Sequence, residues 1–532
     1  MQGRKEIQPK MMYQVSLIDL VSEDNFYRQL DKLLDLSFLY KATALYYGKE
    51  GQESIDPVVF FKICLVGYLN NINSDRRLIE YCSNCLDVRL YIKYDIDEPL
   101  PWHSTISRTR QLYSEKVFLS LFQKVLSLCV EKGMVRGKRQ AVDSAYIKAN
   151  ASMDSLVEKA VINDSELTQD LIDYCDELNQ NSEFKILPIV DDLSPKDKGR
   201  LTVKRQKQKE VEQHHDWKKE EYKDMPGKGK NDAGRADEFG NIIRPKYLSN
   251  HTHTNPTDPD SRIAVKPGKA RQMNFYAQVA VDDSNHVITA AGADFADKRD
   301  SECLSHILSQ NITNLKQNEI TPEQLLADTG YSSGAALAFC AANNIDAYIP
   351  NHGQYKYHRE GFVYNEELDQ YECIRANKAI LPFRKIIQDY DNNSKKVYRS
   401  DNSKCKICPL RSECIGKSDF KKIEHTIHKP HYDAMHEKIQ TSYAKRIMKK
   451  RGSTVEPVLG TMLNFLNLKR VNTRGIRGAN KHVMMSALCY NLKKLMKFKR
   501  PKLEIKVQII QTKVGELLFL LKRHFKKLTF QF

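Results

Sequence analysis

Apolar side chains recur at helical spacing through the first part of the chain. The pattern is clearest in "VFLSLFQKVLSLCVEKGM" over 117–134, where Gly133 stands near the end, and in "DPVVFFKICLVGYLNN" over 56–71. Apolar residues three or four positions apart lie on one face of a helix, and glycine is common just past a helix end. We therefore predict an all-helical region over 1–135, with a buried helix at 56–71.

Two more helices are expected in the same region, over 74–92 and 103–117, separated by a break that contains proline. The second begins with small polar residues, among them Ser104, and also carries Arg108 and Arg110. A helix, a break and a helix of this kind are typical of a helix-turn-helix variant, in which the second helix contacts DNA. A plain helical bundle explains the pattern equally well, so both interpretations stay open. On the first of them, these three residues are candidate DNA contacts.

After residue 136 the periodicity changes to that of strands. "NFYAQVAVDD" alternates apolar side chains, "DDSN" is typical of a turn, and "HVITAAGADFA" returns as a hairpin partner, because alternate residues of a strand share one face. The expected order is strand 139–150, strand 274–283, strand 286–296, helix 297–313, strand 323–333, helix 333–344 and strand 345–350. We predict an α/β domain over 136–500.

Two insertions interrupt this α/β domain, and a tail follows it. Residues 151–270 are polar and highly charged, which favours some helix followed by a long loop. Residues 351–440 form the second insertion and contain a group of cysteines. Helical sequence resumes after it, and we expect 501–532 to be a basic helical tail.

The element order matches an RNase H-like mixed sheet, in which three antiparallel strands are followed by a helix and two further strands. In that topology the first and fourth strands are neighbours. Asp143 lies in the first strand, and Asp328 stands where the fourth strand ends, in "LLADTGYSS". We therefore expect the two carboxylates to lie side by side, although either aspartate alone would suit an ordinary strand or turn.

Two adjacent carboxylates repel each other, and a divalent cation that takes their oxygens as ligands removes that conflict. A third acid, Glu456, is expected at the start of an apolar helix in "KKRGSTVEPVLGTMLNFLNL". Ser453 and Glu456 also fit a capping box, which is a purely structural alternative. Together the three acids predict a two-metal site that acts on phosphodiesters.

The charge of the chain favours a polyanionic partner. Lysine and arginine number 84 against 67 aspartates and glutamates, a net charge of +17. Such an excess is typical of nucleic-acid binding, with a basic solubility surface as the alternative. No secretory leader is evident, and the most apolar stretch, 58–69, is interrupted by Lys62 and too short for a bilayer. We expect a cytoplasmic protein with reduced cysteines and no membrane partner.

Five blocks of the sequence resemble, in order, the catalytic domain of bacterial insertion-sequence transposases of the DDE class. "AVDSAYIKANAS" resembles the segment with the first acid, "LLADTGYSS" that with the second, and "STVEPVLG" that with the third. The block 257–301 resembles the part before the second acid, and 470–495 resembles the end of the domain. The helical sequence from "DPVVFFKICLVGYLNN" to "PWHSTISRTR" resembles the N-terminal domain of these enzymes.

The resemblance implies both a function and its residues. Asp143, Asp328 and Glu456 would be the catalytic acids and would hold two Mg²⁺ ions, for which Mn²⁺ can substitute. The chain would bind the terminal inverted repeats of its insertion sequence, cleave there and transfer the 3′ ends into target DNA. Because two ends must be brought together, we expect a homodimer or a larger assembly on DNA, associated with the bacterial nucleoid.

One part of the chain departs from the family pattern. Many relatives carry a lysine two turns after the glutamate, where this chain has Leu463. A tyrosine and an arginine at fixed spacing before the glutamate are also not cleanly matched, although Arg451 is close. We therefore expect the flanking phosphates to be contacted by Arg451, Lys469 and Arg470.

Four cysteines in the second insertion are candidate ligands of a structural Zn²⁺. Cys405 and Cys408 have the spacing of a zinc knuckle, whereas Cys373 and Cys414 lie at less usual spacings. Reduced thiols or a redox-sensitive cluster are the alternatives.

Two other functions fit the same residues. An RNase H-like nuclease would hydrolyse DNA without strand transfer. A catalytically silent DNA-binding protein derived from a transposase would bind DNA without cleaving it. Mg²⁺-dependent cleavage and strand transfer separate the three.

Overall fold

The computed structural model describes residues 15–48, 54–158, 250, 253–264, 270–353, 355–388 and 393–498. The predictions for most of the charged insertion 151–270 and for the basic tail 501–532 fall outside the described residues. Among the helices that are described, none combines the length and the apolar character needed to cross a bilayer.

The described part of the N-terminal region is helical, as predicted. Its segments are α1 Leu17–Leu20, α2 Phe26–Leu33, α3 Phe38–Thr43, η1 Ala44–Tyr46, α4 Pro57–Leu69, α5 Asp75–Asn84, α6 Leu86–Ile92, α7 His103–Leu112 and α8 Glu115–Glu131. Asp56 caps α4 by accepting a hydrogen bond from the Val58 N–H (2.6 Å), and Pro57 occupies the first turn. The helix expected over 74–92 is two helices, because the backbone is extended at Cys85 (φ −105°, ψ 115°).

The centre of the molecule is a six-stranded mixed sheet. Its strands are β1 Arg139–Lys148, β4 Arg262–Ala264, β5 Gln272–Asp282, β6 Ile288–Phe295, β7 Gln324–Leu326 and β8 Asp346–Tyr348. β1 pairs antiparallel with β5 and parallel with β7; β5 also pairs antiparallel with β4 and β6, and β7 pairs parallel with β8. Parallel neighbours need crossovers, which α12 (Asp300–Lys316) and α13 (Gly334–Ala342) provide. The predicted order of strands and helices from β5 to β8 is confirmed, whereas β4, within the stretch predicted as an insertion, is a strand of this sheet that was not expected.

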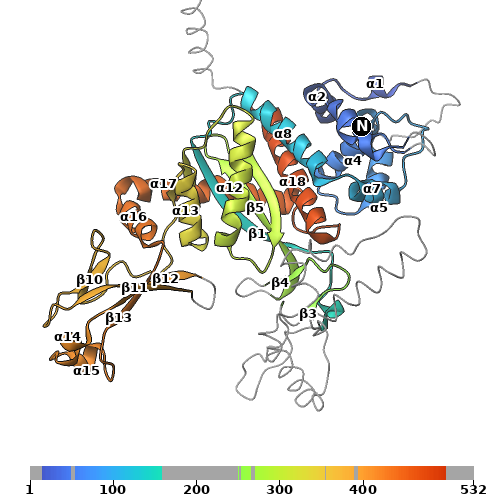
Figure 1. The fold of residues 1–532 in the computed structure, drawn as a ribbon. Coiled ribbons are helices and arrows are strands. Elements are labelled where there is room, and N and C mark those ends of the chain that lie inside the picture. Colours follow the sequence, from blue (N-terminus) through green and yellow to red (C-terminus); the bar gives the residue numbers. More distant parts are fainter. Residues whose placement is uncertain are drawn as a thin grey trace, which may run out of the picture.

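Helices cover both faces of this sheet (Figure 1). α12 and α13 cover one face, where Leu304, Leu337 and Val142 belong to one buried cluster. α17 (Ser442–Phe465) and α18 (Gly475–Lys497) cover the other face. As a result β5 is buried on both faces from Met273 to Asp282.

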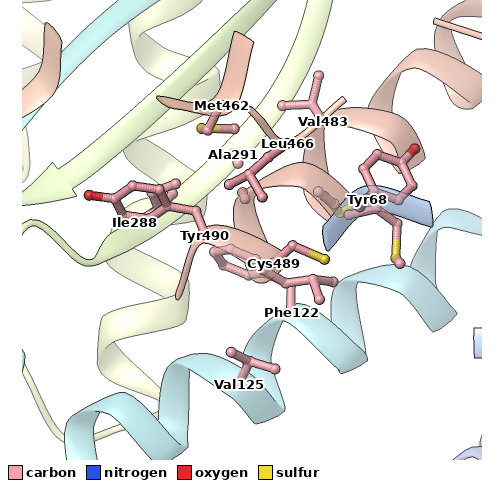
Figure 2. Close-up of a cluster of buried hydrophobic side chains, with 14 of the residues drawn as sticks. Tyr68, Phe122, Val125, Ile288, Ala291, Met462, Leu466, Val483, Cys489 and Tyr490 are labelled. Atoms are coloured by element: carbon pink, nitrogen blue, oxygen red, sulfur yellow. The ribbon is translucent and has the colours of Figure 1, made fainter. Parts of the chain in front are cut away.

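Helix α18 lies between the sheet and the N-terminal helices. Figure 2 shows Val483 and Cys489 of α18 among Tyr68 of α4, Phe122 of α8 and Ile288 of β6. All of these side chains belong to one continuous buried cluster. The N-terminal helices and the sheet therefore stabilise each other through a shared core.

Two smaller sheets complete the described structure. β2 (Val157–Glu158) pairs with β3 (His253–Thr254) at the two ends of the first insertion. The second insertion forms a five-stranded antiparallel sheet that the sequence patterns did not predict, and it stands apart from the central sheet in Figure 1. Its elements are β9 Phe362–Asn365, β10 Gln370–Cys373, β11 Ile380–Gln388, β12 Ser394–Arg399, α14 Asn402–Lys406, α15 Arg411–Cys414 and β13 Lys422–Thr426, and α16 Lys429–Gln440 leads back to α17.

Candidate active site

Asp143 lies in β1, and Asp328 lies just beyond the end of β7, the parallel neighbour of β1. In the pairing of β1 with β7, Ala141 is opposite Leu326. Continuing that register by two residues brings Asp143 opposite Asp328, and neighbouring strands are about 4.8 Å apart. Asp328 follows β7 and caps a short 3₁₀ turn, where its Oδ1 accepts a hydrogen bond from the Gly330 N–H (2.9 Å). The carboxylate at the end of the strand is thus held next to the one in β1.

Glu456 lies in the middle of α17, and not at the start of a helix as expected. The helix begins at Ser442, where the Thr441 hydroxyl caps it by accepting a hydrogen bond from the Ala444 N–H (3.2 Å). The capping-box alternative is therefore wrong: the Ser453 hydroxyl donates to a backbone carbonyl one turn earlier. A lysine- and arginine-rich stretch that precedes Glu456 continues the helix, because those residues are good helix formers.

Arg451 connects the first and third acids. One guanidinium nitrogen lies 3.3 Å from Asp143 Oδ2, and another lies 3.3 Å from Glu456 Oε1. The side chains of Arg451 and Asp143 are mostly buried (16% and 18% exposed), whereas that of Glu456 is 61% exposed. The residue that we expected to contact phosphate thus neutralises the acids in this structure.

The acids impose an electrostatic cost on one another. Burial raises the pKa of the Asp143 carboxyl above its usual range. The neighbouring charges of Asp328 and Asp300 raise this pKa further, while the Ser144 N–H and Arg451 oppose the rise. The negative charge of the Asp143 carboxylate is therefore only partly compensated, and a cation bound next to it would be stabilised.

Asp300 is an acid of this site that the sequence analysis missed. It is the first residue of α12, and its Oδ1 accepts hydrogen bonds from the hydroxyls of Ser144 (2.7 Å) and Tyr276 (2.7 Å). A Cβ placed on Gly330 would lie 2.9 Å from Asp300 Oδ2 and 3.1 Å from Asp328 Oδ1. Glycine thus leaves room for two carboxylates that converge on it. An aspartate at the start of a helix is usually explained by the helix dipole or by capping, which hid this one.

The chemistry of these side chains suits a divalent cation. Carboxylate oxygens are the ligands that Mg²⁺ and Mn²⁺ prefer, and the Arg451 guanidinium already supplies positive charge between two of them. Within the described residues, no three histidine, cysteine, aspartate or glutamate side chains are close enough together to hold a metal ion as they stand. The exposed Glu456 side chain would have to leave Arg451 to complete such a set.

The three residues of α7 that were expected to contact DNA differ in how exposed their side chains are. Arg108 is exposed and Ser104 is half-buried. Arg110 is buried, and its guanidinium makes two hydrogen bonds to the Asp75 carboxylate (2.7 and 2.8 Å), so the prediction that it binds DNA is wrong. Its backbone carbonyl also accepts a hydrogen bond from Lys481 (2.9 Å), which ties α7 to α18.

The remaining predicted residues lie on and after α17. Leu463, which replaces the lysine of many relatives, packs against the main core. Lys469 and Arg470 have exposed side chains in the segment that joins α17 to α18.

The four cysteines of the second insertion do not form a zinc site in this structure. They are free thiols, and they belong to the described residues among which no group of three metal-binding side chains occurs. Cys373 and Cys414 instead pack against the aromatic core of the small sheet, and the Cys405 thiol hydrogen-bonds to the Ser400 hydroxyl (3.0 Å). The spacing of Cys405 and Cys408 is that of a zinc knuckle, but Cys373 and Cys414 pack against the core of the small sheet.

Two family models match the chain. A transposase domain family, DUF772, matches residues 15–112, and a transposase DDE domain family matches residues 373–496. The first match covers α1 to α7; the second covers most of the small sheet and both α17, with Glu456, and α18. No curated protein matches the chain. Asp143 and Asp328 lie outside both matches, so their place in the site depends on the strand register.

Proposed function

We propose that the chain is an insertion-sequence transposase of the DDE class, as its matches to a transposase domain family and a transposase DDE domain family support. On this proposal it binds the terminal inverted repeats of its own element, cleaves the DNA at those ends and transfers the 3′ ends into target DNA. One observation carries the proposal. Asp328, two residues beyond the paired part of β7, aligns with Asp143 when the register with β1 is continued, and Arg451 links Asp143 to Glu456. The proximity of acids from three separate elements supports phosphodiester chemistry with divalent cations, in which carboxylates hold the ions.

We further propose that the catalytic domain is RNase H-like. The pairing of β1 with β5 and of β5 with β6 is antiparallel, and β7 and β8 continue the sheet in parallel on the other side of β1. This is the strand arrangement that the sequence analysis expected for that fold, and it supports the proposal.

In the proposed reaction, Asp143, Asp328 and Glu456 hold two Mg²⁺ ions, and Mn²⁺ can replace them. When bound, such ions activate the attacking oxygen and stabilise the leaving oxygen at the phosphorus. The protein contributes position: β1 fixes the buried Asp143, and the Gly330 N–H orients Asp328. Arg451 balances part of the charge of Asp143 and Glu456 through its contacts with both carboxylates.

Two DNA ends must be processed and joined, so we propose that a homodimer or a larger assembly forms on the DNA. The net charge of +17 supports association with DNA generally, and hence a location on the bacterial nucleoid. Both statements follow from the reaction and the charge, and an assembly measured with and without DNA would test the first.

The decisive experiment is a strand-transfer assay with labelled DNA that carries the ends of the element, with Mg²⁺. We would compare the wild type with Asp328→Asn and with a matched control, Asp346→Asn. Asp346 lies at the other end of the parallel strands and forms an ion pair with Lys438. We expect joined product from the wild type and the control, and none from Asp328→Asn, with DNA binding retained in all three.

The other outcomes identify the two alternatives. Cleavage without joining would indicate a nuclease, and binding without cleavage by the wild type would indicate a silent DNA-binding protein. Equal activity in Asp328→Asn and the wild type would remove Asp328 from the site.

A further inference from the structure

Three segments that are distant in sequence meet beyond the end of β1. The Lys148 N–H donates to the Lys469 carbonyl (3.0 Å), and the Val471 N–H donates to the Lys148 carbonyl (2.9 Å). The Asn73 side chain, just before α5, donates to the Arg470 carbonyl (3.0 Å). The segment between α17 and α18 is therefore joined on one side to β1 and on the other to the turn before α5.

This junction carries many cations that have no acidic partner. We call it the basic junction, and define it by seven exposed residues: Arg76, Arg77, Lys148, Lys469, Arg470, Arg474 and Arg477. Within the described part of the chain, none of the seven takes part in an ion pair, while other cations of comparable exposure, such as Lys32, do. A solvated basic face is the simplest alternative for any one of them, but not for so many gathered at one place.

The acids nearest to the basic junction are already engaged. Asp75 is bound to the buried Arg110. Asp258 and Asp260 accept hydrogen bonds from the first N–H groups of α18, those of Gly475 (3.1 Å) and Ile476 (2.9 Å). The start of α18 is thus satisfied from within, and any external anion would be bound by the cationic side chains instead. Unpaired like charges held close together favour a polyanion, whose binding releases counterions.

The distance from Asp143 to the basic junction suits duplex DNA as the polyanion. Lys148 follows Asp143 by five residues on the same strand, which corresponds to about 16 Å at the rise of a β-strand. Five base pairs of duplex DNA span a similar length, roughly 17 Å at 3.4 Å per base pair. A duplex whose cut phosphate lies at Asp143 can therefore reach the basic junction without bending.

We propose that the basic junction binds the phosphate backbone of the duplex DNA next to the cut, and that Arg76 and Arg77 of the N-terminal region take part with Lys469 and Arg470. The inference rests on the proposed transposase function and deepens it. It gives the first turn of α5 a role in holding DNA against a catalytic site that is formed by other parts of the chain. Because these side chains would contact phosphates and not bases, the binding is independent of sequence.

The test is fluorescence anisotropy with two labelled duplexes, one with the end of the element and one of arbitrary sequence, over a range of salt concentrations. Arg76→Ala/Arg77→Ala and Lys469→Ala/Arg470→Ala are compared with a control, Lys116→Ala/Lys124→Ala, which removes two exposed cations from α8. Removing one cation that binds a phosphate lowers the slope of log K against log salt by about 1, so the slope of each junction variant should fall by about 2. We expect about tenfold weaker binding to both duplexes, and no change in the control.

Wild-type affinity and salt slope in Arg76→Ala/Arg77→Ala would overturn the inference, even if the Lys469→Ala/Arg470→Ala variant binds weakly. An effect confined to the duplex with the element's end would also overturn it, because that result indicates base recognition. Circular dichroism of each variant shows whether the fold is retained, and these exposed substitutions are not expected to alter it. Failure of the catalytic proposal is seen separately, as cleavage by Asp328→Asn.

Discussion

Replacing Arg451 by glutamine tests whether the acids require a positive charge. The substitution removes the guanidinium 3.3 Å from Asp143 and from Glu456 and keeps most of the side-chain length. At an effective dielectric constant of 20, the Asp143 contact alone amounts to about 5 kcal/mol before desolvation is subtracted. Desolvation offsets most of that, and the Glu456 contact, largely in water, adds about 0–1 kcal/mol. We expect a net loss of about 1–2 kcal/mol in the free energy of unfolding, measured without divalent cations.

The same variant should respond more strongly to Mg²⁺ or Mn²⁺ than the wild type does. If ions bind as proposed, an ion in the wild type would have to displace the guanidinium from Glu456, whereas in Arg451→Gln the acids would have no competing cation. Urea denaturation followed by circular dichroism, in EDTA and in MnCl₂, measures both effects. Arg446→Gln removes an exposed arginine five residues earlier on α17 and is the matched control.

Equal stability of Arg451→Gln and the wild type in EDTA would refute the reasoning, because it would mean that the acids do not repel one another enough to matter. An identical Mn²⁺ response in the two proteins would refute it as well, since the guanidinium would then not occupy a place that the ions take.

Three further predictions follow from the same contacts. In EDTA, Asp143→Asn should be more stable than the wild type at pH 7, and with Mg²⁺ it should be inactive in cleavage. Because the pKa of Asp143 is raised in the folded state, ionisation of this carboxyl lowers the free energy of unfolding as the pH rises above 3.8. Urea denaturation at pH 4 and 7 measures the difference. Gly330→Ala should lower the cleavage rate about 10–100-fold by displacing Asp300 and Asp328, and circular dichroism should show an unchanged fold. The control is Gly460→Ala on α17, where the new Cβ has open space around it. A normal cleavage rate in Gly330→Ala would contradict the geometry. Burial lowers the pKa of His425 to about 4, so protonation of this ring should destabilise the small sheet as the pH falls from 6.5 towards 4. We expect a loss of roughly 1–2 kcal/mol in the free energy of unfolding, reduced because part of the ring still contacts water. His425→Gln should remove that pH dependence, and a pH dependence that persists in the variant would belong to another group.

The parts of the fold that the sequence predicted are those with a local signal. The alternation in β5 and the helical spacing in α4 and α8 each depend on residues close together in the chain. The order of these elements then led to the prediction that Asp143 lies beside Asp328, which the parallel register of β1 with β7 supports. The sheet of the second insertion was not predicted, because its short strands alternate weakly and its buried core is only five residues, each from a different strand: Phe362, Tyr371, Leu381, Tyr398 and Ile423.

The parts of the site that the sequence did not predict depend on contacts over long distances. Arg110 and Arg108 look alike in the sequence, and only the fold shows that one of them is buried against Asp75, 35 residues earlier. Asp300 belongs to the site because the hydroxyls of Ser144 and Tyr276 hold it there. No spacing rule contains that information, since the three residues lie on three separate elements.

The contrast between Asp143 and Glu456 shows how the site can be both assembled and adjustable. Asp143 is mostly buried in the middle of a strand that pairs on both sides, so its carboxylate cannot move far. Glu456 is 61% exposed, and Gly452, one turn before it, leaves the space into which its carboxylate projects, since a Cβ there would lie 3.0 Å from Oε1. If the acids bind cations as proposed, Glu456 is the side chain that moves and Arg451 is the group that it leaves. Gly452→Ala would then restrict Glu456 and weaken Mn²⁺ binding while leaving Asp143 in place, and unchanged Mn²⁺ binding in that variant would show that the exposed acid is not the mobile one.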